Sequence, residues 1–123
     1  MTLPLKHFSP KEFKCSCGCG LGYESMKESV LTLVDNIRAK CGFPIIVTSS
    51  IRCPKHNKKI GGVKNSFHCQ GLACDLTPLK KDNFELLCVV SEKLNPNGGV
   101  GIYPKNIFVH VDCRGQRARW LNG

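Results

Sequence analysis

The chain has 123 residues, which is enough for one domain. With 41% hydrophobic and 22% charged residues, it has the composition of a globular protein and not of a disordered one. Its formal net charge of +9 favours polyanionic partners, namely nucleic acid, an anionic membrane or an anionic cell-wall polymer, without choosing among them. The basic residues are spread along the chain and form no arginine-rich arm, so a solvated basic surface is the simpler interpretation.

The N-terminus and the cysteines bear on the expected compartment. The first residues lack the apolar core of a secretory signal, and no stretch of about 18 apolar residues is available to span a membrane. The nine cysteines are odd in number and come without an export signal, which favours reduced thiols. We therefore expect a monomer that is cytoplasmic as synthesised and has no stable membrane association.

The predicted elements begin after an irregular segment, residues 1–24, that is rich in glycine, proline and cysteine. Ser25 and Glu28 have the spacing of a capping box, and apolar residues follow at helical spacing as far as Cys41, where a glycine ends the helix. Residues 45–48 are all β-branched and predict a short strand.

The second half of the chain adds more strands and another helix. Residues 49–71 show no periodicity and predict a long loop, which in a compact domain is often functional. The elements expected after it are a strand over 72–77, a helix that starts at the capping pattern Asp82–Glu85, and strands over 100–103 and 107–113 that form a hairpin. Together the elements predict one α+β domain over residues 1–123, with a small, mainly antiparallel sheet and two helices.

Side-chain alternation in two of these strands predicts a shared open face. In the last strand the odd-numbered positions from 107 to 113 are apolar or cysteine and should face the core, which leaves His110 and Asp112 on the other face. The same alternation leaves Asp75 opposite its apolar neighbours, and His68 precedes Asp75 by seven residues. Two imidazoles and one carboxylate, from His68, Asp75 and His110, form a sound catalytic zinc set with a fourth position for water.

The segment from Ser66 to Asp75, SFHCQGLACD, matches the pattern S-x-H-x-x-G-x-A-x-D at every fixed position. This pattern resembles the zinc-ligand motif of the M15 metallopeptidases, which are D-alanyl-D-alanine carboxypeptidases and L-alanyl-D-glutamate endopeptidases. The segment FVHVD, residues 108–112, is similar to the one that carries the last ligand of that family. Further matches are SSIR with Asn57, then GG, GIY and RW at positions 49–52, 61–62, 101–103 and 119–120. The resemblance runs from about His7 to Trp120 and implies the fold of hedgehog domains and D-Ala-D-Ala peptidases.

The resemblance implies roles for individual residues. His68, Asp75 and His110 would be the Zn²⁺ ligands, and Arg52 would bind the scissile carbonyl and stabilise the developing oxyanion. Substrate contacts are expected at Ser66, His56 and Tyr103. The Ser66 hydroxyl suits the loop turn before His68 as well as it suits substrate, so both roles stay open.

Position 107 departs from the family pattern. Many relatives have an acidic general base three residues before the last histidine, whereas this chain has Ile107, which cannot take a proton. Strand alternation also places Ile107 on the core face. Asp112 is the natural substitute on the metal side, and it can serve either as the base or as a carboxylate that holds His110 or Arg52.

The resemblance implies a zinc-dependent peptidase that hydrolyses peptide bonds in peptidoglycan stem peptides or cross-links, as a carboxypeptidase or an endopeptidase. A chain without a signal suits a phage-type endolysin that reaches the wall after release, and the net charge of +9 suits an anionic wall. The alternative is a non-catalytic, zinc-containing wall-binding module of the same fold, with Ile107 marking the loss of catalysis. A cysteine-rich zinc protein that binds nucleic acid rests only on charge and on the cysteines from Cys15 to Cys19, so no nucleic-acid partner is expected.

Cys15, Cys17 and Cys19 form a separate cluster near the N-terminus. Their spacing differs from the CxxC of a strong zinc site, and three thiols in five residues do not readily give a tetrahedron. The pattern favours a reduced loop over a structural metal completed by Cys53 or another distant cysteine.

Overall fold

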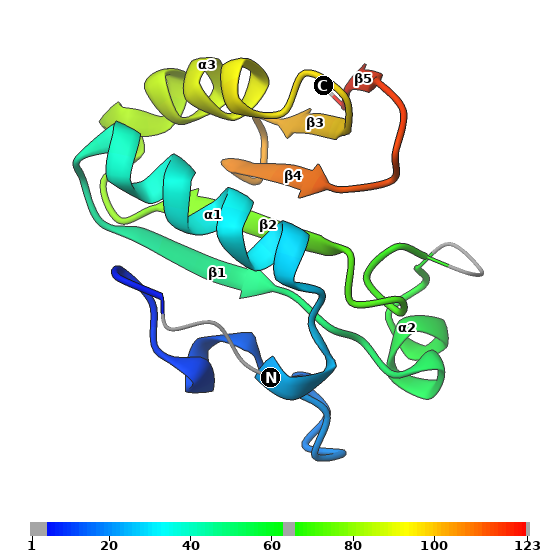
Figure 1. The fold of residues 1–123 in the computed structure, drawn as a ribbon. Helices are drawn as coiled ribbons and strands as arrows, with labels where there is room; N and C mark the ends of the chain where they lie inside the picture. The colour runs from blue at the N-terminus through cyan, green and yellow to red at the C-terminus, as the bar shows by residue number, and fades with distance from the viewer. Residues whose placement is uncertain (1–4, 63–65, 123) are drawn as a thin grey trace.

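A computed structural model describes residues 5–62 and 66–122 of the chain. Within this part the sheet has five strands, in the order β1-β2-β4-β3-β5. The strands are β1 Ile45–Ser49, β2 Ala73–Pro78, β3 Gly99–Tyr103, β4 Phe108–Asp112 and β5 Ala118–Leu121. Neighbouring strands are antiparallel except β3 and β5, which are parallel. The fold is therefore α+β with a mainly antiparallel sheet, as the sequence predicts (Figure 1).

One face of the sheet is apolar and covered by helices. Cys74 and Leu76 of β2 and Val109 and Val111 of β4 are fully shielded from solvent, at 0% exposure. The helices α1, Glu28–Cys41, and α3, Phe84–Leu94, pack on this face and against each other (Figure 1). Each fully buried aliphatic side chain contributes about 1.5–3 kcal/mol, so this layer is a main source of stability. The other face of the sheet remains open for polar side chains.

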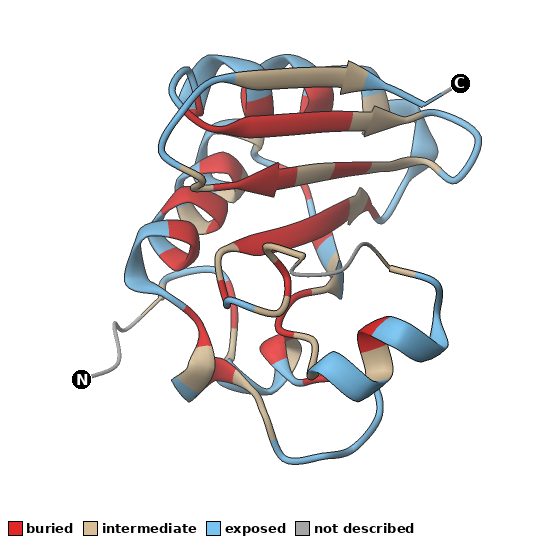
Figure 2. Cartoon of the chain, turned by 90° about the vertical axis from the view of Figure 1, so that its right-hand side faces the viewer, coloured by how far each residue is buried: buried red, intermediate tan, exposed pale blue. Residues whose placement is uncertain are grey.

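The N-terminal segment packs against the domain without joining the sheet. It contains two short 3-10 helices, η1 Pro10–Phe13 and η2 Tyr23–Ser25. The Phe13 side chain is fully buried, and its ring centroid lies 5.8 Å from those of both Phe8 and Tyr23. Figure 2 shows short buried stretches of this otherwise exposed segment. These aromatic contacts attach the segment to the same hydrophobic core as the sheet.

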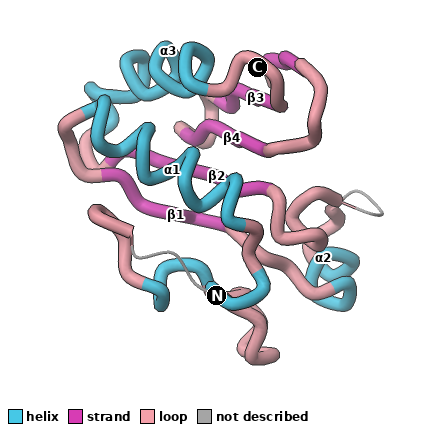
Figure 3. The backbone as a smooth tube through the Cα atoms, in the orientation of Figure 1, coloured by secondary structure: helices cyan, strands magenta, loops and turns pink. Residues whose placement is uncertain are grey.

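A third helix, α2 Pro54–Lys59, lies within the stretch 49–71 that the sequence predicts as loop, so that prediction is wrong for these six residues. Helix α2 has no apolar stripe for periodicity to detect. It starts instead through a proline in its first turn and through Cys53, whose sulfur accepts the backbone N–H of His56. Figure 3 shows α2 and the N-terminal segment both below β1. Residues 63–65 of the predicted loop lie outside the described residues.

The predicted capping boxes are also wrong. Helix α1 begins at Glu28 with Lys27 as its N-cap, and no side chain caps it, because Ser25 belongs to η2. Helix α3 follows directly from a 3-10 turn, η3 Lys81–Asn83, likewise without a side-chain cap. In the described residues, no helix combines the length and apolarity that crossing a membrane requires.

Candidate active site

Four residues on the open face of the sheet form one row across four strands. His110 of β4 lies opposite Asp75 of β2 on one side and opposite Gly101 of β3 on the other, and Gly101 pairs with Trp120 of β5. The Nδ1 atom of His110 is 3.1 Å from Oδ1 of Asp75. Strand alternation thus predicts the shared face of Asp75 and His110 correctly, and the register brings the two side chains into contact.

His68 reaches the same point from the loop before β2. Its side chain is only 4% exposed, and its Nε2 lies 3.2 Å from Oδ1 of Asp75. Its Nδ1 lies 2.8 Å from the carbonyl oxygen of Ser50, and a carbonyl oxygen can only accept a hydrogen bond, so Nδ1 is the donor and Nε2 is the nitrogen left to bind a metal. The backbone also ties the two loops, because the N–H of Arg52 donates to the carbonyl of His68 at 3.1 Å.

His68, Asp75 and His110 can hold a metal ion. Each offers one ligand atom, and the three atoms lie within 4.8 Å of one another. Burial acts to raise the pKa of Asp75, but hydrogen bonds from His110 and His68 outweigh it and lower that pKa to about 2. The carboxylate is therefore ionised at neutral pH beside Nε2 of His68 and Nδ1 of His110, the two nitrogens that would give up their protons on binding a metal. Two nitrogens and one carboxylate oxygen are the donor set of a metal site with an open position.

Asp112 contacts the far side of His110. Its Oδ2 is 2.6 Å from Nε2 of His110, which leaves Nδ1 directed at Asp75. Burial disfavours charge on the imidazole, yet the carboxylates of Asp112 and Asp75 prevail and raise the pKa of His110. A carboxylate behind a histidine fixes both the orientation and the tautomer of the ring, which is the usual support of a metal-binding imidazole.

The carboxylate of Asp112 is enclosed, with an exposed fraction of 0%. Arg114 holds it with two side-chain bonds, Nε to Oδ1 at 2.8 Å and Nη2 to Oδ2 at 2.7 Å, and the N–H of Gly99 donates to Oδ1 at 3.1 Å. Although burial acts to raise the pKa of Asp112, hydrogen bonds from Arg114 and His110 lower it well below its usual range. This geometry suits an anchor for His110 and not a base in the cleft, because no part of the carboxylate reaches the cleft surface.

Arg52 is held rigidly at the edge of the site. Its Nη2 lies 3.5 Å from Oδ2 of Asp75, its Nε donates to the Ser49 hydroxyl at 3.1 Å, and its Nη1 donates to the side-chain carbonyl of Asn57 at 3.0 Å. A guanidinium has five N–H donors, so these three partners fix its plane and leave donors for a further acceptor. Asn57 belongs to α2, which thereby positions Arg52.

These side chains line one pocket of about 410 Å³. It is lined by charged, small and aromatic residues, among them Arg52, Ser66, Phe67, His68, Asp75, Tyr103, His110, Arg114 and Trp120. A larger pocket of about 470 Å³ lies over the N-terminal segment, but no histidine lines it and its charged residues are scattered. The smaller pocket is the candidate active site, because the titratable groups converge there.

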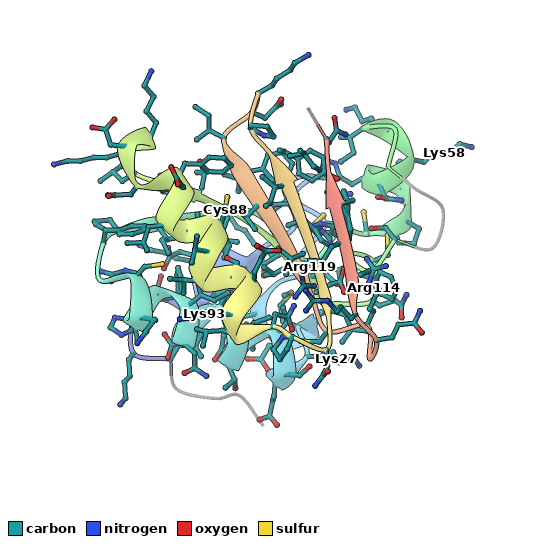
Figure 4. All side chains as sticks on the ribbon, turned by 90° about the horizontal axis from the view of Figure 1, so that it is seen from above. Lys27, Lys58, Cys88, Lys93, Arg114 and Arg119 are labelled. Atoms are coloured by element: carbon teal, nitrogen blue, oxygen red, sulfur yellow. The ribbon has the colours of Figure 1, made fainter. Side chains whose placement is uncertain are left out.

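Aromatic rings form the wall around His110. The Trp120 ring centroid lies 5.2 Å from that of His110, and the indole Nε1 donates to the Tyr103 hydroxyl at 2.9 Å. A Cβ atom at Gly101 would overlap the Trp120 ring, so only glycine lets the indole reach His110. Arg119, labelled in Figure 4, donates to the carbonyl of Gly98 at 2.7 Å and so holds β5 in place.

The predicted substrate residues fall into two groups. Ser66 and Tyr103 line the pocket, and the Ser66 hydroxyl also accepts the N–H of His68 at 3.1 Å, so it shapes the turn as well. His56 does not line this pocket; it lines a separate one with Cys53 and Lys59. The substrate contact of His56 stays a prediction, and α2 places this residue beside Cys53.

Ile107 departs from its predicted position on the core face. It lies in the turn before β4, half-buried, with a positive φ of 55°. The pairing of β3 with β4 ends at Tyr103 and Phe108, so strand alternation does not extend to position 107. An aliphatic residue in this left-handed conformation is unusual, and its carbonyl accepts the Thr77 hydroxyl at 2.5 Å.

Sequence reasoning missed Arg114 as a site residue. Its guanidinium binds Asp112 and lies 4.6 Å from the Phe67 ring centroid and 5.1 Å from that of Trp120. Arg114 is labelled in Figure 4. Arg114 is two residues after Asp112, so continued alternation would have placed it on the same face as His110. Strand β4 ends at Asp112, however, and alternation does not apply beyond it.

The pocket places residues that can bind a metal beside a fixed guanidinium, an arrangement expected of a metallopeptidase. Comparison with known sequences agrees: the profile of the family described as Peptidase M15 matches residues 6–112. The chain belongs to this family of peptidases.

A curated relative is also similar. Over 80 residues, or 62% of this chain, the sequence is 36% identical to the probable peptidoglycan L,D-endopeptidase MepK of Haemophilus influenzae. The matching stretch spans 38% of that protein, so well over half of the relative has no counterpart in the alignment.

Proposed function

We propose that the chain is a zinc-dependent peptidase that hydrolyses peptide bonds in the stem peptides or cross-links of peptidoglycan. The observation that carries this proposal is the convergence of His68, Asp75 and His110 within 4.8 Å in a pocket that also contains Arg52. When bound there, Zn²⁺ supplies a Lewis acid that activates water and polarises the scissile carbonyl. Zinc fits the donor set, since nitrogen and carboxylate ligands with an open position are typical of its catalytic sites.

Arg52 is proposed to bind the carbonyl oxygen of the scissile bond. Its bonds to Ser49, Asn57 and Asp75 fix the guanidinium before substrate arrives, and preorganised donors stabilise a developing oxyanion without reorganisation. Tyr103 and Ser66 are proposed to contact the peptide, because both line the pocket and each has a hydroxyl proton to donate.

Asp112 is proposed to position His110. Of the two roles that the sequence leaves open, this one agrees with its complete burial and with its contacts to His110 and Arg114. The carboxylate keeps the Nε2 proton of His110 in place, so that Nδ1 stays available to the metal.

Three observations support peptidoglycan as the substrate. The chain belongs to the M15 peptidases, and the name of the H. influenzae relative is that of a peptidoglycan L,D-endopeptidase. That name favours an endopeptidase over a carboxypeptidase for this chain. The net charge of +9 would help to retain the protein on an anionic wall polymer.

A non-catalytic wall-binding module remains a second candidate, and position 107 favours it. Ile107 cannot accept a proton, and among the described residues that line the pocket Asp75 is the sole carboxylate. A binding module would keep the metal and the peptide contacts but would cleave nothing.

Digestion of purified peptidoglycan separates the two candidates. The wild-type protein, supplied with zinc, should release peptide fragments that mass spectrometry identifies by the bond cut. His68→Ala should release none, whereas Arg117→Ala, at an exposed position outside the pocket, should act as the wild type does. Binding to peptidoglycan without any cleavage by the zinc-loaded wild type would instead support the binding module.

A further inference from the structure

Four cysteines that the proposed peptidase activity does not use meet at one place. The sulfur of Cys17 lies 3.4 Å from that of Cys15 and 3.5 Å from that of Cys53. With Cys19 included, the four sulfur atoms all lie within 4.8 Å of one another. Sulfurs that share one tetrahedral zinc at about 2.3 Å from each lie roughly 3.8 Å apart, so the cluster has the dimensions of a four-thiolate site.

The local backbone explains how three thiols within five residues can converge. Gly18, between Cys17 and Cys19, and Gly20, directly after Cys19, have positive φ values of 78° and 97°, which bend the chain around the cysteines. The N–H of Cys15 donates to the carbonyl of Leu21 at 2.8 Å and closes the loop. The fourth thiol comes from Cys53, which is far along the chain and is the N-cap of α2.

Hydrogen-bond donors and lysine side chains surround the sulfurs. The N–H of His56 donates to the sulfur of Cys53 at 3.3 Å, and the backbone amides of Cys17 and Cys53 donate to that of Cys15. Lys55 and Lys59 line the same pocket, and their charges oppose the net charge of −2 that four thiolates and one Zn²⁺ would carry. Cys17 and Cys19 are exposed, so an ion can enter.

We propose that Cys15, Cys17, Cys19 and Cys53 bind one structural Zn²⁺, separate from the metal of the active site, and that this ion positions Arg52. Cys53 follows Arg52 directly, and Asn57 of the same helix holds the Arg52 guanidinium at 3.0 Å. The ion would join the N-terminal segment to α2. Helix α2 has six residues and no apolar stripe, so the ion would hold it in place.

Metal content tests this proposal without any activity measurement. The wild-type protein, purified under reducing conditions and supplied with zinc, should retain about two zinc ions per chain, measured by inductively coupled plasma mass spectrometry. The double variant Cys17→Ser/Cys19→Ser and the variant His68→Ala should each retain about one. Cys41→Ser, at a half-buried cysteine of α1 outside the cluster, should retain two.

Replacing zinc with Co²⁺ identifies the ligands of the cysteine site by absorption spectroscopy. Co²⁺ in the wild type and in His68→Ala should show the sulfur-to-cobalt charge-transfer absorption of a tetrahedral thiolate site, and Cys17→Ser/Cys19→Ser should lose it. A zinc content in Cys17→Ser/Cys19→Ser equal to that of the wild type, a disulfide among these four cysteines in the reduced preparation, or iron in place of zinc would each overturn the proposal.

The proposal that the cysteine-bound ion positions Arg52 has its own test, provided that the wild type cleaves peptide. Cys17→Ser/Cys19→Ser should lower kcat, and the same double change in an Arg52→Ala background should lower it no further, because both act through one group. Losses that multiply independently would show that the cysteine site does not act through Arg52, while the zinc content would still decide whether the site exists.

Discussion

The Nε2 atom of His110 lies 2.6 Å from Oδ2 of Asp112, while Nδ1 of the same ring faces Asp75 at 3.1 Å. One imidazole thus joins a carboxylate that lines the pocket to a fully enclosed one, and Arg114 holds the enclosed carboxylate by two bonds. This chain of contacts fixes the ring and supports the proposal that Asp112 positions His110.

Removing the charge of Asp112 should therefore weaken metal binding first. Asp112→Asn should lower the affinity of the site for zinc by about 10- to 100-fold, with a matching loss of activity at limiting zinc. Competition with a chromophoric chelator measures the affinity. Asp82→Asn, at an exposed position in η3, is the control. Unchanged zinc affinity together with a collapse of kcat would mean that Asp112 is a general base after all.

Arg52 should matter to the reaction and little to the metal. Arg52→Ala should lower kcat by roughly 10²-fold or more while zinc stays bound, since it removes a donor to the developing oxyanion. Arg52→Lys should recover only part of the rate, because a lysine lacks the planar fork that Ser49 and Asn57 hold. Steady-state kinetics on a purified stem peptide provide the comparison, with Arg117→Ala as the matched control. A kcat equal to that of the wild type in Arg52→Ala would remove this role.

Gly101 should be intolerant of any side chain. In Gly101→Ala the new methyl group would overlap the Trp120 ring and displace it from His110. The protein has one tryptophan, so its fluorescence emission should shift, and kcat/KM should fall while the zinc of the cleft is retained. Gly22→Ala, where the nearest atom to a new Cβ is 3.6 Å away, should change neither quantity. An unshifted emission spectrum in Gly101→Ala would contradict this packing.

The metal-free protein should lose stability in acid. The folded-state pKa of Asp75 is about 2, and that of Asp112 is also lowered, whereas an unfolded aspartate titrates near ~3.9. The unfolded chain therefore binds more protons over this interval, so the free energy of unfolding should fall as the pH drops from about 4 towards about 2. Urea titrations at several pH values, on protein whose metal has been removed with a chelator, measure this fall in the free energy of unfolding. Asp112→Asn should show a shallower dependence, and an equal slope in both proteins would exclude Asp112 as a source.

The three candidate metal ligands can be predicted from the sequence because their positions follow from strand periodicity and from one local motif. Alternation in β2 and β4 places Asp75 and His110 on one face, and the segment from Ser66 to Asp75 supplies His68. The features that could not be predicted depend on pairings that leave no periodic signal. Cys53 meets Cys17 only after the chain has folded, and strand β5 has four residues, which are too few for alternation to reveal.

Helix α2 illustrates the same limit. Its six residues are mostly polar, and it is held by Cys53 at its start and by Asn57 through Arg52, which are contacts between side chains and not a pattern in the sequence. The role of Asp112 also depended on an observation that only three dimensions give, namely that Arg114 and Gly99 enclose its oxygens.

Anomalous X-ray scattering at the zinc edge, from crystals grown with Zn²⁺, tests the central claim most directly. We expect a strong anomalous peak bounded by His68, Asp75 and His110, and the loss of that peak in His110→Ala crystals grown in the same way. The proposed site would be contradicted if the wild-type protein digests peptidoglycan but its zinc-grown crystals show no anomalous peak between these three residues.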